Sequence, residues 1–410
     1  MTDLLFLVHR IPYPPDKGDK IRSYHLLRHL AQGYRVHLGG FVDDPKDWVH
    51  EERVKNLCGG QTCLLSLHPF RAKMKSVPGL WMGDPLTLHY YRHRQLAGWV
   101  DRLLVDCPIE RVVVFSSALA PLVMKPGLER MRRVVDLVDV DSSKWSQYGQ
   151  RKKGLAGWIY RREGVKLLEA ERRIALAFDA TLLVSPTEAA LFRSLAPESA
   201  DKIDYWENGV DSTYFSADFA VGKGGVGNPY GLGDADSQNF VMVFTGAMDY
   251  WANIDAVCWF VRSVFFRIRE RLPQARFVIV GGHPTAEVVA LGKVPGVWVT
   301  GRVADIRPYV AYAQLAVAPL RIAQGVQNKI LEAFAMGKPV LTTHKGMEGI
   351  RRCPQLDGLV CDDAAQMADR AVWLLENPLA AQSLGDRGRQ HVEAYYNWEN
   401  NLERVSQILA

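Results

Sequence analysis

The stretch that decides the fold is Gln324-Gly-Val-Gln-Asn-Lys-Ile-Leu-Glu-Ala-Phe-Ala-Met-Gly-Lys-Pro-Val-Leu341. It predicts a loop, then a helix with Asn328 as its N-cap and Gly337 just past its C-terminus, and then a buried strand. The apolar residues expected on the buried face recur at helical spacing and are Ile330, Leu331, Phe334 and Ala335. Pro339 ends the helical pattern because proline lacks the backbone N–H that a helix needs.

The start of this helix suits an anion. A helix N-terminus reached through a glycine loop presents free backbone N–H groups and a partial positive charge. Lys329 lies in the first turn, where a cation opposes the helix dipole, so we expect it to face an anion. Glu332 lies near the same face and is placed to reach a sugar hydroxyl beside that anion. The alternative interpretation is an ordinary helix with an exposed Lys–Glu pair.

These residues resemble the donor-binding motif of the retaining GT-B glycosyltransferases of the large family four. That motif has two glutamates, followed by an Ala-Met-Gly-x-Pro-Val segment. Here Glu332 takes the second glutamate position, and Gln324, eight residues earlier, takes the first. The resemblance implies that Glu332 holds the donor ribose, that Gln324 holds the sugar ring, and that Lys329 stabilises the departing diphosphate. The backbone amides implied to assist belong to Gly325, Val326, Gln327 and Asn328.

Length and composition indicate a soluble globular protein. A chain of 410 residues is too long for a single core, so two domains are expected. The net charge of +5 is too mild to indicate a nucleic-acid binder. Six scattered cysteines without zinc-ligand spacing predict no metal site and a reducing, cytoplasmic compartment. The sequence contains no run of 18 apolar residues, so no transmembrane helix is expected. No cofactor is expected either.

The first half of the chain predicts a doubly wound parallel sheet. Strand 4–8, a helix ending at Gly33 and strand 36–42 form a βαβ unit. Loop 9–20 therefore lies over the carboxyl ends of strands, where such sheets bind ligands. The resemblance implies that this loop approaches the acceptor and the donor phosphates; a Pro-rich surface turn with solvated charges is the alternative. The candidate residues at the helix entry are Gly18, Asp19, Lys20 and Arg22.

Three carboxylates lie near the end of the predicted strand 134–140. They are Asp136, Asp139 and Asp141, and carboxylates at the end of a buried strand are costly unless they are solvated, paired or used. We expect Asp139 to orient an acceptor hydroxyl or to act as its base. The alternative is that these residues cap the helix that follows.

Two segments, 69–99 and 144–173, combine Lys and Arg with large aromatic and aliphatic residues. This mixture suits contact with an anionic membrane surface. Amphipathic helices with solvated outer faces are the alternative interpretation.

The second domain is expected at 208–392, after an Asn-Gly-Val-Asp turn that resembles the interdomain crossing of GT-B enzymes. Its strands end in Gly or small residues, which allow a ligand close to the backbone. The resemblance implies that Gly246 lies under the donor phosphates and that Gly301 and Val303 bracket the nucleobase. The Arg and Lys that many relatives carry after the first strand of this domain are absent: residues 247–253 read Ala-Met-Asp-Tyr-Trp-Ala-Asn.

Together these features predict an α/β protein of GT-B type, with two Rossmann-like doubly wound parallel-sheet domains facing a cleft. The expected domains are 1–207, with 393–410 packing back on it, and 208–392. Four motifs, Pro14–Arg22, Asp136–Trp145, Phe244–Tyr250 and Gly325–Lys329, together resemble the sugar transferases associated with exosortase (PEP-CTERM) exopolysaccharide systems. That resemblance implies metal-independent, retaining transfer from a nucleotide-diphosphate sugar to a glycan or polyprenyl-linked acceptor, at the inner face of the cell membrane. A catalytically silent scaffold subunit and a non-hydrolysing nucleotide-sugar epimerase are the alternatives.

Overall fold

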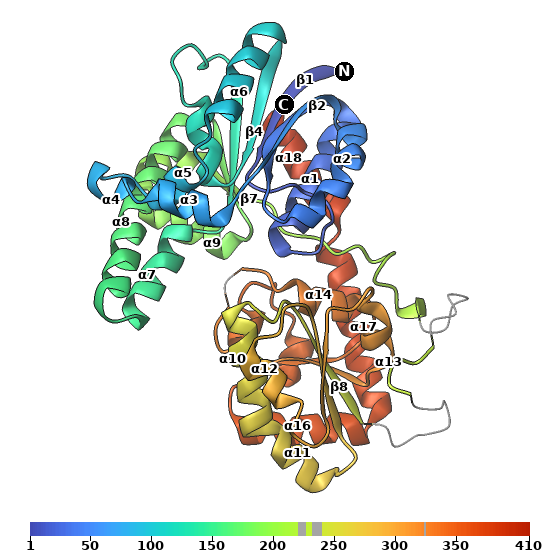
Figure 1. Ribbon diagram of the computed structural model, residues 1–410. Coiled ribbons are helices and arrows are strands. Elements are labelled where there is room, and N and C mark those ends of the chain that lie inside the picture. The colour runs from blue at the N-terminus through green and yellow to red at the C-terminus, as the bar shows by residue number, and fades with distance from the viewer. Residues whose placement is uncertain (220–226, 232–239, 324) are drawn as a thin grey trace. The chain divides into compact units, whose positions relative to one another are not determined.

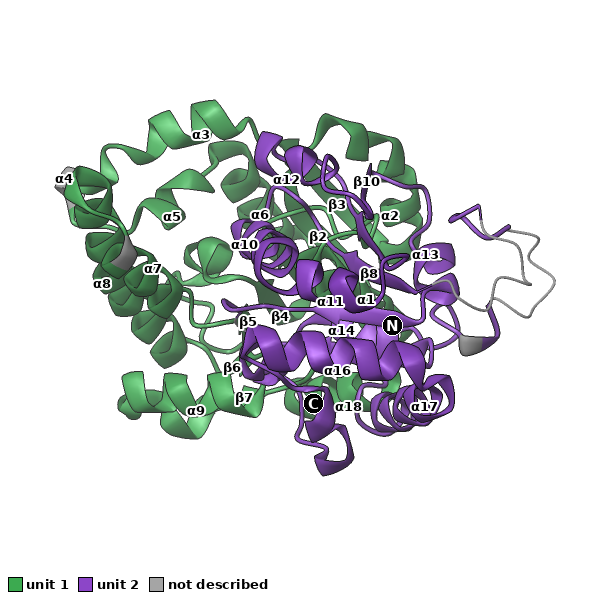
Figure 2. Cartoon of the chain, turned by 90° about the horizontal axis from the view of Figure 1, so that it is seen from below, with its two compact units in different colours: residues 1–207, 399–410 green, residues 208–398 purple. Residues whose placement is uncertain are grey.

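The computed structural model describes residues 1–219, 227–231, 240–323 and 325–410. The chain divides into two compact units (Figure 2), which are considered separately below. Unit 1 comprises residues 1–207 and 399–410, and unit 2 comprises residues 208–398.

Unit 1 is a parallel sheet with helices on both faces (Figure 1). Its described strands are β1 (Thr2–Val8), β2 (Tyr34–Val42), β3 (Gly59–Ser66), β4 (Ile109–Phe115), β5 (Arg132–Val138), β6 (Ala180–Leu183) and β7 (Ile203–Tyr205). The order across the sheet is β3-β2-β1-β4-β5-β6-β7, so the direction of winding reverses between β1 and β4. Its helices are α1 (Gly18–Gly33), α2 (Glu51–Cys58), α3 (Pro69–Ser76), α4 (Gly79–Met82), α5 (Leu86–Tyr90), α6 (Arg94–Asp106), α7 (Asp141–Arg151), α8 (Gly154–Ala177), α9 (Pro186–Leu195) and most of α18 (Trp398–Leu409).

Unit 2 repeats this architecture with a smaller sheet. Its described strands are β8 (Val241–Thr245), β9 (Arg276–Val280), β10 (Val297–Gly301), β11 (Leu315–Ala318) and β12 (Val340–Thr342). They lie in the order β10-β9-β8-β11-β12, so the winding reverses between β8 and β11. Its helices are α10 (Trp251–Trp259), continued by a π-helical segment (Phe260–Phe265) into α11 (Phe266–Arg271), then α12 (Ala286–Leu291), α13 (Arg307–Tyr312), α14 (Asn328–Ala335), α15 (His344–Met347), α16 (Ala364–Glu376) and α17 (Pro378–Tyr395).

The strands are buried because helices cover both faces of each sheet. Leu4 through Val8 of β1 are fully buried, as are the central residues of β8 and β9. Strands buried on both faces read as continuous apolar runs, which is the pattern that the sequence carries at these positions. The predicted α/β class with two doubly wound parallel sheets is confirmed.

Two local predictions need correction. Strand β5 ends at Val138, two residues earlier than expected, because the chain turns sharply there. Asn328 is the first residue of α14 and not its N-cap; Gln327 takes that position, without a side-chain capping hydrogen bond. Gly337 does adopt the left-handed conformation expected past the helix end, with φ 68°.

Residues 69–106 of unit 1 form a series of mostly short helices. These are α3, α4, α5 and α6. Tertiary contacts hold these short helices: Arg162 of α8 donates hydrogen bonds to the carbonyls of Gly79 (2.7 Å) and Leu80 (3.1 Å). Isolated helices of this length are unstable in water, so the local sequence alone does not predict them.

Candidate functional site

In unit 2 the winding reverses between β8 and β11, and ligands of doubly wound sheets bind at the carboxyl ends of the strands at such a point. Gly246 follows β8 with φ 155°, and its carbonyl oxygen would lie 1.7 Å from a Cβ built on Gly281 after β9. The chain turns after these neighbouring strands therefore pack backbone against backbone. Only glycine at position 281 permits this approach, because any Cβ there would overlap the Gly246 carbonyl.

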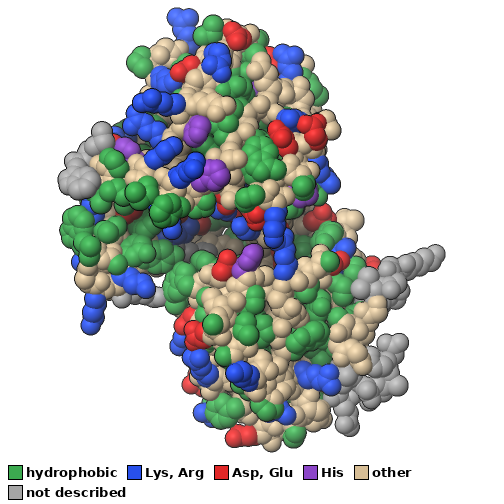
Figure 3. Space-filling view, in the orientation of Figure 1, with side chains coloured by type: hydrophobic (Ala, Val, Ile, Leu, Met, Phe, Trp, Pro, Cys, Tyr) green, Lys and Arg blue, Asp and Glu red, His purple; other side chains and the backbone are tan. Residues whose placement is uncertain are grey.

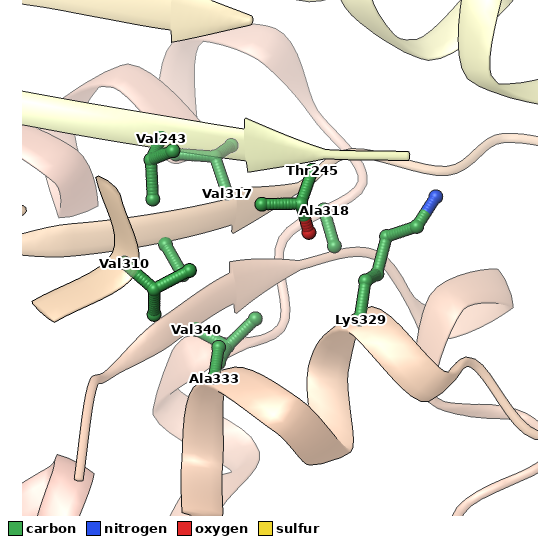
Figure 4. A pocket seen from close by; sticks show the side chains of 9 residues that line it. Val243, Thr245, Val310, Val317, Ala318, Lys329, Ala333 and Val340 are labelled. Atoms are coloured by element: carbon green, nitrogen blue, oxygen red, sulfur yellow. The ribbon is translucent and has the colours of Figure 1, made fainter. Parts of the chain in front are cut away.

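Lys329, in the first turn of α14, reaches this end of the sheet (Figure 4). Its Nζ donates a hydrogen bond to Asn253 Oδ1 and lies 4.5 Å from the centre of the Phe244 ring. A Cβ built on Gly246 would lie 3.2 Å from Lys329 Nζ and 2.8 Å from Asn253 Nδ2. Gly246, Asn253 and Lys329, from three different elements, therefore meet at one point.

The stem of Lys329 borders a small apolar cavity of about 10 Å³, while its ammonium group points away from that cavity (Figure 4). The cavity is lined by Val243, Thr245, Val310, Ala316, Val317, Ala318, Lys329, Ala333 and Val340. It is no larger than one water molecule, so it belongs to the packing behind the site. The apolar wall keeps the lysine stem in place and directs its charge to the strand ends.

The electrostatics of Lys329 are unusual. Burial lowers its pKa to about 7, and among the described residues only the charge of Glu332, one turn along α14, opposes that shift. Burial raises the pKa of Glu332 to about 7 in turn, with the charge of Lys329 opposing the rise. No carboxylate of the described chain forms an ion pair with Lys329, whose partners are an amide and an aromatic ring. An anionic ligand would therefore supply the charge partner that the protein does not.

The remaining candidate donor residues lie along the same edge of the unit 2 sheet. Gly325 precedes α14 with φ 63°, and its carbonyl oxygen accepts a hydrogen bond from Gln327 Nε2 (3.3 Å). Val326 packs against the core, and the Asn328 side chain accepts a hydrogen bond from Asn208 (3.4 Å). Gln324 lies outside the described residues.

Gly301 and Val303 lie further along the sheet, after the edge strand β10. Gly301 has φ 71°, and its carbonyl oxygen accepts a hydrogen bond from the N–H of Gly281 (3.1 Å). Two strand spacings, about 10 Å, separate the ends of β10 and β8. A ligand that touched both Gly301 and Lys329 would have to be as extended as a nucleotide.

The sequence missed two residues of this site. Asn253 of α10 is almost fully buried and also donates a hydrogen bond to the carbonyl of Ala247 (2.9 Å), so it links the glycine turn to Lys329. Phe244 lies on β8 with its ring under the ammonium group. Its place in the sequence could have pointed to Asn253, because it lies in segment 247–253, where the Arg and Lys of many relatives are absent.

In unit 1 the two basic candidate residues, Lys20 and Arg22, form ion pairs with carboxylates of the same unit. Lys20 is fully buried and its Nζ lies 2.6 Å from Asp47 Oδ2. Arg22 is fully buried and donates to both carboxylate oxygens of Asp136, at 2.9 and 3.2 Å. Because both charges are neutralised within unit 1, these contacts give no support to the prediction that Lys20 or Arg22 neutralises a donor phosphate.

The other candidates of unit 1 lie at the carboxyl end of its sheet. Gly18 begins α1, and Asp19 follows it and accepts hydrogen bonds from Arg10 (2.5 Å) and His9 (3.2 Å). Asp139 follows β5, and its Oδ2 lies 2.6 Å from Lys144 Nζ. The structure therefore brings Asp19 and Asp139 to the same edge of one sheet.

Residues 239–377 match the family described as "Glycosyl transferases group 1". A GDP-mannose-dependent monoacylated alpha-(1-6)-phosphatidylinositol monomannoside mannosyltransferase of Corynebacterium glutamicum is 30% identical over 150 residues, which are 33% of this chain and 39% of the relative. A GDP-mannose-dependent alpha-(1-6)-phosphatidylinositol monomannoside mannosyltransferase of Mycobacterium tuberculosis is 27% identical over 253 residues, which are 58% of this chain and 63% of the relative. These alignments thus span less than two thirds of either relative.

Solved structures match over the whole chain. Anabaena HepE in complex with UDP and glucose has a TM-score of 0.64 at 15% identity, covering 100% of this chain and 99% of that one. WaaG, a glycosyltransferase involved in lipopolysaccharide biosynthesis, has a TM-score of 0.61 at 16% identity, with 99% of each chain covered. The chain has the GT-B glycosyltransferase fold.

In this GT-B chain the family match falls on unit 2, the unit that contains Lys329 and Gly246. Within the described ranges, no group of three or more His, Cys, Asp or Glu is arranged to hold a metal ion. None of the helices in the described part of the chain is long and apolar enough to cross a membrane.

Proposed function

We propose that this protein is a glycosyltransferase that moves a sugar from a nucleotide-diphosphate sugar to a lipid-linked glycan acceptor in exopolysaccharide biosynthesis. The observation that carries the proposal is Lys329: a cation at a helix N-terminus, beside the glycine turn of Gly246, without a carboxylate ion-pair partner among the described residues. A diphosphate supplies the missing negative charge. The match to group 1 glycosyltransferases supports the same function.

In the reaction, the bond between the anomeric carbon and the diphosphate oxygen breaks, and the acceptor oxygen bonds to that carbon. Negative charge grows on the departing diphosphate, where Lys329 and the N-terminal amides of α14 stabilise it. The acceptor attacks on the face that the diphosphate leaves, which retains the anomeric configuration. The leaving phosphate takes the acceptor proton, so neither a dedicated base nor a metal is required. Glu332 holds the ribose of the donor, and Gln324 contacts the sugar.

The nucleotide is the first property to test. The mannosyltransferase relatives are named as GDP-mannose-dependent, and the HepE structure holds UDP, so both nucleotides are candidates. A thermal-shift screen of UDP, GDP, ADP and CDP should give stabilisation by one of them in buffer containing EDTA. The matching nucleotide sugar should then be consumed with retention, which NMR of the product anomer measures.

The same assay separates the alternatives. Nucleotide binding without turnover on any acceptor would identify a catalytically silent scaffold. An epimerised nucleotide sugar, formed without an acceptor, would identify an epimerase. Failure of all four nucleotides to stabilise the chain would contradict the proposed function itself.

A membrane-bound acceptor calls for a membrane-facing surface, and unit 1 carries a suitable patch. The described apolar side chains that α3 and α8 expose are Phe70, Met74, Leu155, Trp158, Val165 and Leu176. Lys and Arg residues lie near them in the sequence, and Figure 3 displays apolar side chains beside basic ones on one face of unit 1. Such a mixture binds anionic headgroups while the apolar groups enter the interface.

Vesicle flotation tests this contact. The protein should float with vesicles containing phosphatidylglycerol and not with phosphatidylcholine alone. A double variant, Phe70→Ser with Trp158→Ser, should lose most of this binding. The control is Leu379→Ser, which removes an apolar side chain of unit 2 that is 88% exposed. Equal loss in the control, or binding that ignores lipid charge, would contradict the membrane patch.

A further inference from the structure

Positive φ angles outside glycine occur where parallel strands end. The non-glycine residues with positive φ in the described ranges are Ser116 (84°), Val138 (69°) and His283 (56°), which lie at or just after the ends of β4, β5 and β9. A residue with a Cβ adopts this conformation at a cost in free energy, and such residues gather at binding sites. Each of the three therefore calls for a cause.

Hydrogen bonds within unit 1 account for Ser116 and Val138. The N–H of Ser116 donates to the carbonyl of Asp136 (2.8 Å), and its Oγ accepts from the N–H of Ala118 (3.4 Å). The N–H of Val138 donates to Asp136 Oδ1 (3.0 Å), and its carbonyl accepts from the N–H of Val184 (2.6 Å). Both conformations are thus fixed by contacts that the residues make themselves.

His283 lacks such contacts. It is exposed, and within the described ranges neither its backbone nor its imidazole forms a hydrogen bond or an ion pair. Pro284 follows it and restricts it further, because proline drives the residue before it towards extended backbone angles. A glycine at position 283 would adopt φ 56° without this cost. The imidazole is present where glycine would be cheaper, which points to a role for the side chain itself.

The backbone on both sides of His283 is fixed to the glycine turn of Gly246. The carbonyl of Gly282 accepts a hydrogen bond from the N–H of Met248 (2.9 Å), and the N–H of Thr285 donates to the carbonyl of Met248 (3.4 Å). Met248 is fully buried and lies two residues after Gly246. Loop 282–285 is therefore held beside that turn, and the imidazole of His283 extends from a backbone in a constant position.

His283 lies between the two points that the proposed donor would span. Strand β9 pairs with β8 on one side and with β10 on the other. Gly246, beside Lys329, follows β8, and Gly301 ends β10. Neighbouring strands lie about 4.8 Å apart, so a nucleotide that reaches from Gly246 to Gly301 passes over the end of β9. His283 is exposed just after that strand end.

A diphosphate at this edge needs more hydrogen-bond donors than Lys329 supplies. The Arg and Lys that many relatives carry after the first strand of this domain are absent from residues 247–253. An imidazole presents one N–H in either tautomer and two when it is protonated, so it can donate to a phosphate oxygen. We propose that His283 is a donor-binding residue, whose imidazole donates a hydrogen bond to the diphosphate of the nucleotide sugar at the end of β9. This inference rests on the proposed glycosyltransferase function.

The test measures nucleotide affinity and fold stability of the full chain in parallel. The probes are the nucleoside diphosphate that stabilises the chain in the thermal-shift screen and the nucleoside that it contains. His283→Gly removes the imidazole and relieves the backbone strain. We expect the Kd for the diphosphate to rise about tenfold in titration calorimetry, as for the loss of a hydrogen bond to a charged group. The midpoint of urea unfolding should not fall, and the Kd for the nucleoside, measured by competition, should be unchanged.

Two further variants control this result. His283→Asn should lose less affinity than His283→Gly, because asparagine tolerates positive φ and keeps an N–H donor. His344→Gly is the matched control. His344 is exposed and follows β12 at the same end of the sheet, but it begins α15 and pairs with Asp362 (2.7 Å). It should leave the Kd for the diphosphate unchanged and lower the urea midpoint, because glycine weakens a helix.

An unchanged Kd for the diphosphate in His283→Gly would overturn the assignment and leave the proposed function standing. A Kd for the nucleoside that rose as much as that for the diphosphate would place His283 at the ribose or the base, against the phosphate contact. A lower urea midpoint with unchanged affinity would make His283 a structural residue. If the wild-type chain bound none of the four nucleotides, the proposed function would fail, and this inference with it.

Discussion

Each unit begins a helix at the carboxyl end of its sheet with a basic residue in the first turns, but the two helices treat that charge differently. In unit 1, Lys20 and Arg22 of α1 are buried against the carboxylates of Asp47 and Asp136. In unit 2, Lys329 of α14 is half-buried and has an amide and an aromatic ring as its partners. A buried cation with a carboxylate is part of the structure, whereas one that lacks it in the described chain is available to an anionic ligand.

The largest effect is expected where the charge is structural. Arg22→Met leaves Asp136 buried without its charge partner, so we expect a loss of roughly 3–5 kcal/mol in the free energy of unfolding. Urea unfolding followed by circular dichroism measures it. Adding Asp136→Asn removes the unpaired charge and should recover most of the loss. A loss below about 1 kcal/mol in the single variant would mean that Arg22 is not structural.

Lys329→Met should show the opposite behaviour. Removing a desolvated charge that has no carboxylate ion pair should change the free energy of unfolding by less than about 1 kcal/mol. The turnover of nucleotide sugar should fall by about 10²–10³-fold, because the growing charge on the diphosphate loses its main partner.

The control for Lys329 is Lys338→Met. Lys338 is another half-buried lysine, whose pKa burial lowers to about 8, but it lies beyond the other end of α14. This variant should keep its turnover. Equal losses in the two variants would point to damage to unit 2 in general rather than to a ligand contact.

The sequence predicted the fold well because long apolar strands and glycine-terminated helices are local signals. It placed Lys329 in the first turn of α14 and Gly246 at the end of β8, and the structure brings the two together. It could not reveal the carboxylate partners of Lys20 and Arg22, because Asp47 and Asp136 lie 27 and 114 residues away. The sequence around a basic residue at a helix start is the same whether its charge partner is a carboxylate of the protein or a bound ligand.

The sequence also missed residues whose role depends on contacts across the fold. Asn253 reaches Lys329 from 76 positions away, and nothing in its neighbourhood marks it. His283 was not a candidate, because its backbone conformation and its place between the ends of β8 and β10 depend on how these strands pair with β9. Asp139 was expected within strand 134–140, yet β5 ends at Val138, where the chain turns, and Asp139 lies outside the strand.

The pH dependence of nucleotide binding gives a third test. Burial lowers the pKa of Lys329 to about 7, so above that pH the free protein carries a neutral amine. A diphosphate prefers the ammonium form, so binding must then take up a proton, and affinity should fall by up to about tenfold per pH unit above pH 7. Titration calorimetry with the nucleotide diphosphate in buffers of different ionisation enthalpy measures both quantities.

Two variants assign that pH dependence. Lys329→Met should remove it. Glu332→Gln should move its onset to lower pH, because the Glu332 charge acts to raise the pKa of Lys329. If the affinity of Lys329→Met still changed with pH, another group would be responsible. The claim that Lys329, unlike Lys20, is available to an anionic ligand would then fail.

The smallest effect is expected at Asn253. Asn253→Ala removes one side-chain amide with two hydrogen bonds: its Oδ1 accepts from Lys329 Nζ, and its Nδ2 donates to the Ala247 carbonyl. Loss of a net hydrogen bond is worth about 1 kcal/mol, so the KM for the nucleotide sugar should rise about fivefold, as steady-state kinetics would measure. An unchanged KM would mean that the donor itself holds Lys329 in place.

Asn253→Asp carries the comparison one step further, because it gives Lys329 the carboxylate that Lys20 already has in unit 1. The new charge should raise the pKa of Lys329 and move the onset of the pH dependence upward, opposite to Glu332→Gln. It should also repel the diphosphate, so nucleotide binding should weaken below pH 7, where the wild-type lysine is already charged. Tighter binding in this variant would show that Lys329 binds the diphosphate better with an internal carboxylate beside it. The lack of a carboxylate partner would then not be what makes the end of the unit 2 sheet a ligand site.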